Sequence, residues 1–139
     1  MATIQLSIPG KPIAKARPRF ARRGKFVSTY SPQATEEGLW IMSAREQLKN
    51  RNLSYPLLVE FIFCIERPKS HFGKHGVKAS APAMPTAKPD LSNYIKFAED
   101  CLNECFVWPD DSYIVDIAAK KRYVSSSPRT DITITEFLL

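Results

Sequence analysis

The sequence predicts one α+β domain over residues 1–139, in which two main helices pack on a small mixed sheet. Three patterns carry this prediction. Residues 3–8 alternate between apolar and polar side chains, and residues 57–65 form a long apolar run. From residue 91 to residue 105, apolar side chains recur at the three- and four-residue spacing of an amphipathic helix.

In the first half of the chain, the alternation in residues 3–8 predicts a strand that Pro9 and Gly10 end. Residues 11–30 form a basic arm, for which we expect an irregular but ordered path. Ser31 followed by Pro32 is typical of a helix entry, with serine at the cap and proline at the first helical position. We expect this helix to end near residue 49.

In the second half, residues 57–65 are interrupted only by Glu60, which favours a central strand buried on both faces. Residues 67–89 are rich in Pro, Lys, Gly and Ser and predict a long flexible loop. A helix is expected from about residue 90 to 106, with Asp90 as its N-cap. Residues 113–123 and 130–137 are predicted to form the two closing strands.

The charge of the chain is basic and unevenly distributed. Twenty Lys and Arg oppose 14 Asp and Glu, and 44% of the residues are hydrophobic, which is enough for a core. The first acid is Glu36, and the basic arm before it indicates a polyanionic partner. Its cations are Lys11, Lys15, Arg17, Arg19, Arg22, Arg23 and Lys25.

Three cysteines do not form an even disulfide framework, and they indicate free thiols in a reducing cytoplasm. No apolar signal region or membrane-length apolar run is present, so we expect a soluble protein that does not contact a membrane. His71 and His75 could join Cys101 and Cys105 as zinc ligands by their spacing. Because both cysteines fall in the apolar stripe of a helix, buried thiols are the favoured interpretation.

Polar residues that suit phosphodiester chemistry gather at the predicted start of the second helix. Asp90 is followed by Ser92, Asn93 and Lys96, and the pair Asp110–Asp111 follows the helix. Mg²⁺ prefers carboxylate and water oxygens, and a lysine can neutralise phosphate charge. The sequence does not fix whether the acid pair returns to Asp90 within one chain or through a second subunit. Helix capping, a polar turn and a solvated lysine are the competing structural roles.

The chain resembles the RusA family of Holliday-junction resolvases over nearly its whole length. The matching segments are residues 8–20 (IPGKPIAKARPRF), 88–96 (KPDLSNYIK), 108–116 (WPDDSYIVD) and 121–123 (KRY). The long segment at residues 67–89 is the least similar part. Members of this family are small homodimeric endonucleases, often prophage-encoded, that use Mg²⁺ to resolve four-way DNA junctions by paired nicks.

The resemblance implies a role for each matching residue. It makes Asp90, Lys96 and Asp111 catalytic, and Asp90 and Asp111 metal ligands, with Ser92 and Asp110 as further candidate ligands for Mg²⁺ or Mn²⁺. Asn93 and Asp116 would support those ligands. It also implies a homodimer that binds branched DNA in the bacterial cytoplasm, associated with the nucleoid. The implied DNA contacts are the cations of the basic arm together with Lys88, Lys120 and Lys121.

Ser92 departs from the family pattern Asp-x-Asp-Asn, in which the second aspartate stands at this position. Serine keeps an oxygen ligand but lacks the charge, so we expect weaker Mg²⁺ binding, partly compensated by Asp110 or Asp116. A junction-binding protein with a weakened or inactive metal site is the alternative. A third hypothesis is a partner-binding protein whose basic arm contacts an acidic protein.

Overall fold

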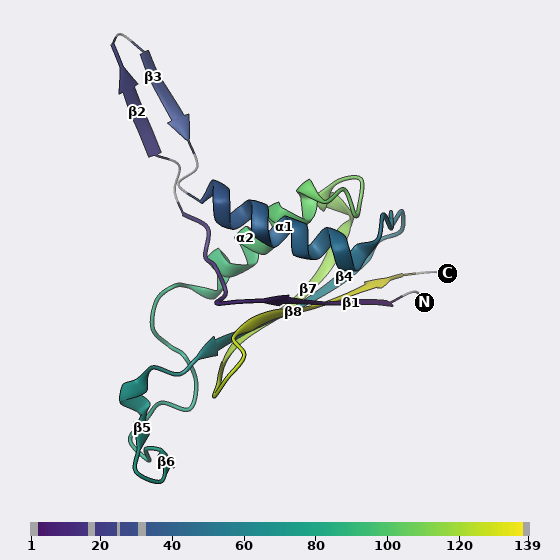
Figure 1. Ribbon diagram of the computed structural model, residues 1–139. Helices are drawn as coiled ribbons and strands as arrows, with labels where there is room; N and C mark the ends of the chain where they lie inside the picture. Colours follow the sequence, from purple (N-terminus) through teal and green to yellow (C-terminus); the bar gives the residue numbers. More distant parts are fainter. Residues whose placement is uncertain (1–2, 17–18, 25, 31–32, 138–139) are drawn as a thin grey trace.

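A four-stranded mixed sheet forms the framework of the computed structural model, which describes residues 3–16, 19–24, 26–30 and 33–137 (Figure 1). The strand order is β1-β8-β4-β7. β8 pairs antiparallel with both β1 and β4, whereas β4 and β7 run parallel. The predicted α+β class and small mixed sheet are confirmed. The strands span Thr3–Pro9 (β1), Leu57–Glu66 (β4), Ile114–Val124 (β7) and Arg129–Glu136 (β8).

Two helices, α1 (Ala34–Leu48) and α2 (Leu91–Glu104), cover the same face of this sheet (Figure 1). The prediction that β4 is central is confirmed, but the prediction that both of its faces are buried is wrong. Its opposite face leaves Glu60 exposed and Leu58 and Ile62 only partly buried, because no helix packs there among the described residues. The helix-covered face holds the core side chains Leu57, Val59, Phe61 and Phe63 of β4, with Ile4, Leu6, Ile8, Ile132 and Ile134 beside them.

Helix α2 belongs to the connection that joins the parallel strands β4 and β7. Parallel neighbours need such a crossover, which carries the chain from the end of one strand back to the start of the next. The start of α2 therefore lies near the carboxyl ends of β4 and β7. Tyr94, in the first turn of α2, is buried and stacks on Phe63 near the end of β4, with ring centroids 5.2 Å apart. This packing fixes the helix start against the sheet.

The basic arm contains a two-stranded antiparallel hairpin, β2 (Arg19–Arg23) and β3 (Phe26–Tyr30), so the expectation of an irregular path is wrong there. Gly24 has φ +62° at the turn, a conformation that glycine adopts without steric cost. Aromatic and β-branched residues in β3 favour a strand. The hairpin projects away from the sheet (Figure 1). The predicted helix entry at Ser31–Pro32 lies outside the described residues.

Residues 67–88, which we call the lobe, project from the carboxyl end of β4 and contain short regular elements (Figure 1). These are the 3-10 turn η1 (Lys69–His71) and the strands β5 (Phe72–Gly73) and β6 (Gly76–Val77), which pair with each other. The flexibility expected for this segment stays a prediction. Among the described residues, no helix is long and apolar enough to cross a membrane.

Candidate active site at the start of helix α2

Asp90 occupies the N-cap position of α2, as predicted, with an extended backbone at φ −68° and ψ 147°. In the described part of the chain its side chain makes no capping hydrogen bond to the first turn. Instead, the Lys88 ammonium donates to Asp90 Oδ1 at 2.7 Å, and about half of the Asp90 side chain is exposed. The simple capping role therefore does not account for this carboxylate, which remains accessible.

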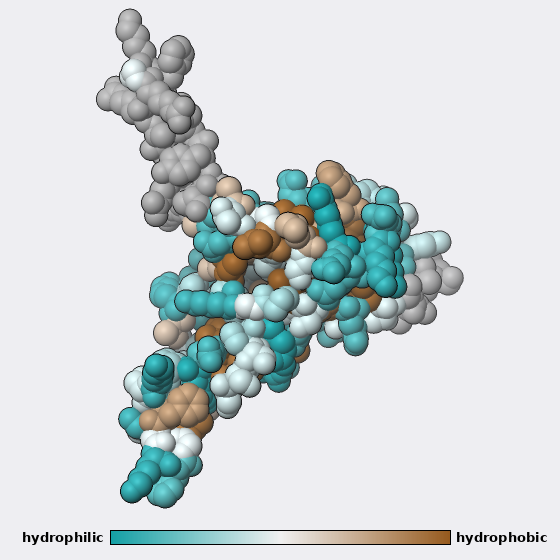
Figure 2. Space-filling view, in the orientation of Figure 1, coloured by the Kyte–Doolittle hydropathy of each residue, from teal (hydrophilic) through white to brown (hydrophobic). Residues whose placement is uncertain are grey.

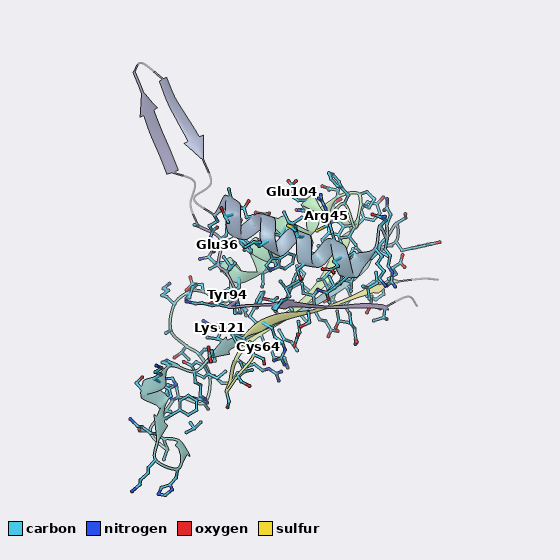
Figure 3. All side chains as sticks on the ribbon, viewed as in Figure 1. Glu36, Arg45, Cys64, Tyr94, Glu104 and Lys121 are labelled. Carbon is cyan, nitrogen blue, oxygen red and sulfur yellow. The ribbon has the colours of Figure 1, made fainter. Side chains whose placement is uncertain are left out.

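Two lysines keep Asp90 ionised. The hydrogen bond from Lys88, followed by its positive charge, lowers the pKa of the Asp90 carboxyl below its ordinary value, and the charge of Lys121 acts in the same direction. Lys121 lies on β7 and donates to the carbonyl oxygens of Ala87 and Pro89 at 3.0 and 2.9 Å. It thereby joins the end of the sheet to the segment that leads into α2 (Figure 3).

The polar face of α2 continues from this point. Ser92, Asn93 and Lys96 are exposed, opposite the buried stripe that contains Tyr94 and Phe97. Ser92 and Lys96 are four residues apart, so they lie on the same side of the helix. The backbone N–H of Lys15 donates to the Asn93 carbonyl oxygen at 2.9 Å, which brings the base of the basic arm to the first turn of α2.

The turn after α2 positions the two following acids. Trp108 is buried and its indole N–H donates to Oδ1 of Asn103 on α2. Asp110 then begins the 3-10 turn η2 (Asp111–Tyr113) and accepts a hydrogen bond from the Ser112 backbone N–H at 3.2 Å. Bonds from Ser112 lower the pKa of the Asp110 carboxyl. Asp110 thus has a capping role in this turn, while Asp111 is exposed.

Glu99 on α2 is the neighbour of Asp111, and the sequence analysis did not select it. Partial burial of Glu99 raises its pKa, and the negative charge of Asp111 and a hydrogen bond between the two carboxyl groups add to this. Glu99 lies three residues after Lys96 on the polar face of α2, and that helical spacing was the available signal.

The described contacts place Asp90 and Asp111 in separate surroundings. Asp90 contacts Lys88, whereas Asp111 contacts Glu99, nine residues and about 13 Å further along the helix axis. Within the residues that the structure describes, no three His, Cys, Asp or Glu side chains are grouped to hold one metal ion. Asp116 pairs with Leu58 in the β4–β7 register and so faces away from α2, on the opposite face of the sheet.

The predicted DNA-contacting cations differ in their surroundings. Lys15 forms ion pairs with Asp100 at 3.1 Å and with Glu37 at 3.8 Å. Burial acts to lower the pKa of Lys15, but the hydrogen bond to Asp100 and the negative charge of Asp100 raise this pKa overall. Lys11 and Lys120 are exposed. The backbones of Arg19, Arg22 and Arg23 lie in β2, and Arg17 and Lys25 lie outside the described residues.

The cysteines and histidines do not come together as a zinc site in the described part of the chain. Cys101 is buried in the core, and burial raises the pKa of its thiol to about 12. Cys105 is half-buried, and His71 of the lobe packs its ring against Tyr123 on β7. The favoured interpretation of free, mostly buried thiols is confirmed for Cys64 and Cys101.

Two comparisons with known proteins bear on this site. Residues 9–135 match the family model described as endodeoxyribonuclease RusA. The chain is also similar to an uncharacterised protein named YqaN from Bacillus subtilis strain 168, with 29% identity over 141 residues that cover 98% of each protein. Both similarities extend over nearly the whole chain and include the start of α2 and the turn that follows it.

Proposed function

The chain belongs to the RusA family of endodeoxyribonucleases, and from this membership we propose that it is a metal-dependent endonuclease that resolves four-way DNA junctions by paired nicks. The observation that carries the proposal is the accessible, ionised carboxylate of Asp90 at the start of α2, surrounded by the cations Lys88 and Lys121. An ionised carboxylate suits a divalent cation, and the cations suit the phosphates of DNA.

The donor set at α2 and η2 fits Mg²⁺ in its chemistry, since all candidate ligands are oxygens. Asp90 would hold the ion, with the Ser92 hydroxyl as a neutral ligand. Because Asp111 of the same chain lies in separate surroundings beside Glu99, it would join Asp90 at the ion only from a second subunit. Bound there, Mg²⁺ supplies an activated water and neutralises the charge that develops on phosphorus. Lys96 is exposed on the same side of α2 as Ser92, where its ammonium can contact a phosphate oxygen.

Lys88 has a defined part in this proposal. Its ammonium now neutralises Asp90, and its side chain is 84% exposed, so it is free to turn towards solvent. With a divalent cation held at Asp90, the Lys88 ammonium would be available to bind a DNA phosphate. A homodimer would present two such sites to the two strands of a junction, whose two-fold symmetry matches that of a dimer.

Replacing Asp90 or Asp111 with asparagine tests the assignment. The junction-cutting rate of each variant should fall at least about a hundredfold. Loss of a metal ligand reduces activity more than loss of the residues that support a ligand. Junction binding should persist in both. Cutting is measured on a labelled four-way junction in Mg²⁺, and binding by gel shift in the presence of a chelator.

A matched control is Glu46→Gln, which removes one exposed carboxylate from α1, away from the site. It should cut at the rate of the unmodified protein. Full cutting by both Asp90→Asn and Asp111→Asn would overturn the assignment.

Two observations favour a second candidate function, a junction-binding protein without nuclease activity. Ser92 supplies no charge at a position where the family pattern has an aspartate, and the described part of one chain holds no group of three ligand side chains for a metal. Such a protein would bind junctions tightly without cutting them in Mg²⁺ or Mn²⁺.

A further inference from the structure

The lobe at residues 67–88 has the charge of a nucleic-acid contact. It contains five Lys and Arg and two His, and it contains no Asp or Glu. Lys69, Lys74 and Lys78 are exposed, and within the described residues none of them forms an ion pair with a carboxylate. Hydrophilic side chains cover the tip of the lobe (Figure 2). Unpaired cations gathered on one projection favour a polyanionic partner.

The lobe is fastened to the sheet at its first residue. The Arg67 guanidinium lies over the Tyr123 ring, 4.4 Å from its centroid, and donates to the Pro82 carbonyl oxygen at 2.8 Å. His71 meets the same ring edge-on, with centroids 5.2 Å apart. Its backbone oxygen accepts from the Lys78 N–H at 2.8 Å, which closes the small β5–β6 hairpin. Side chains on this hairpin are therefore held at a set distance from the sheet.

The other end of the lobe leads directly to the candidate active site. Lys121 holds the Ala87 and Pro89 carbonyl oxygens, and the next residue is Asp90. On the other side of the same helix start, the base of the basic arm is held by the Lys15–Asn93 backbone hydrogen bond. Asp90 thus lies between the bases of two basic projections, the β2–β3 hairpin and the lobe (Figure 1).

We propose that the lobe is a second DNA-backbone contact, which grips phosphates on one side of the candidate active site while the basic arm grips them on the other. This inference rests on the proposed function for its partner, DNA. It assigns contacts to Lys69, Lys74 and Lys78, which are not among the DNA contacts that the resemblance implies. Its cations would each neutralise a phosphate without reading the base sequence.

The test compares two double variants that remove the same charge. Lys74→Gln with Lys78→Gln changes the exposed tip of the lobe, and Lys49→Gln with Arg51→Gln changes an exposed site at the end of α1. Binding to a four-way junction and to a linear duplex is measured by fluorescence anisotropy, in chelator, between about 50 and 300 mM NaCl. Circular dichroism checks that each variant is folded.

If the lobe contacts two phosphates through Lys74 and Lys78, the lobe variant should show a log–log plot of binding constant against salt that is less steep by about 1.8. Its affinity for the junction at about 0.1 M salt should fall roughly 10- to 100-fold. The control pair should keep the slope of the unmodified protein. Equal slopes and affinities for the two double variants would overturn the inference, while junction binding by the unmodified protein would leave the proposed function standing. If the unmodified protein bound neither DNA, the proposed function would fail and the inference with it.

Discussion

Two side chains two residues apart decide what the start of α2 can do. Asp90 offers an ionised carboxylate because Lys88 and Lys121 stabilise its charge. As pH falls through the lowered pKa of Asp90, this carboxylate and its attraction for a cation are lost together. Ser92, in the first turn of α2, offers only a neutral oxygen. The negative charge at this position is therefore smaller than the family pattern supplies, and we expect weaker binding of a divalent cation.

The change Ser92→Asp should strengthen metal binding. A second carboxylate in the first turn of α2 adds an anionic ligand, and we expect the Mg²⁺ concentration for half-maximal junction cutting to fall about tenfold, which corresponds to about 1.4 kcal/mol. The measurement is a titration of the cutting rate with Mg²⁺.

Ser54→Asp is the matched control, because Ser54 is exposed and lies outside the candidate site. An unchanged metal requirement in Ser92→Asp would show that position 92 does not contact the ion. A silent parent that gains activity with this change would identify a decayed site.

At the scale of elements, α2 and η2 meet at two acidic side chains, Glu99 on α2 and Asp111 in η2. Glu99 has a raised pKa from burial and from Asp111, so the folded state binds its proton more tightly than the unfolded state does. Its contribution to the free energy of unfolding is therefore most favourable below the ordinary pKa of about 4.5 and falls as pH rises through the raised value.

Glu99→Gln should remove this pH dependence. Since glutamine resembles the protonated acid, the variant should match the parent near pH 4 and exceed its free energy of unfolding at pH 7 by about 0.5 kcal/mol or less, as befits a partly exposed pair. Urea unfolding at the two pH values measures the difference. The control variant Glu46→Gln measures the effect of losing one carboxylate elsewhere on the surface. A Glu99→Gln variant that is less stable than the parent at pH 7 would contradict the expectation.

Most of the elements could be predicted from sequence, because period-2 and helical patterns specify strand and helix where one face is buried. The helix around Tyr94 and Phe97 and the alternating strand around Ile132 and Ile134 are examples. Strand partners could not be predicted in the same way, since pairing of β4 with β7 and β8 depends on contacts between distant segments. The β2–β3 hairpin was not predicted, because its many cations interrupt the apolar pattern by which a strand is recognised in the sequence. Glu99 was missed because only the fold brings Asp111 to it.

At the scale of the whole molecule, two basic projections lie on either side of the helix start that carries Asp90. Both projections extend beyond the domain core that α1, α2 and the sheet form (Figure 1). This arrangement suits a branched substrate, whose arms leave the branch point in several directions while the cut is made near its centre. Two copies of the chain would place two such helix starts on one junction, and paired nicks would be the product.

The most direct test of this account is a nicking assay on a four-way junction beside a linear duplex of the same sequence, with Mg²⁺, with Mn²⁺ and with chelator. A junction resolvase should give paired nicks on the junction that depend on the divalent cation, with little cutting of the duplex. Tight junction binding without nicks in either metal would contradict it and identify a member of the family that binds junctions but does not cut them.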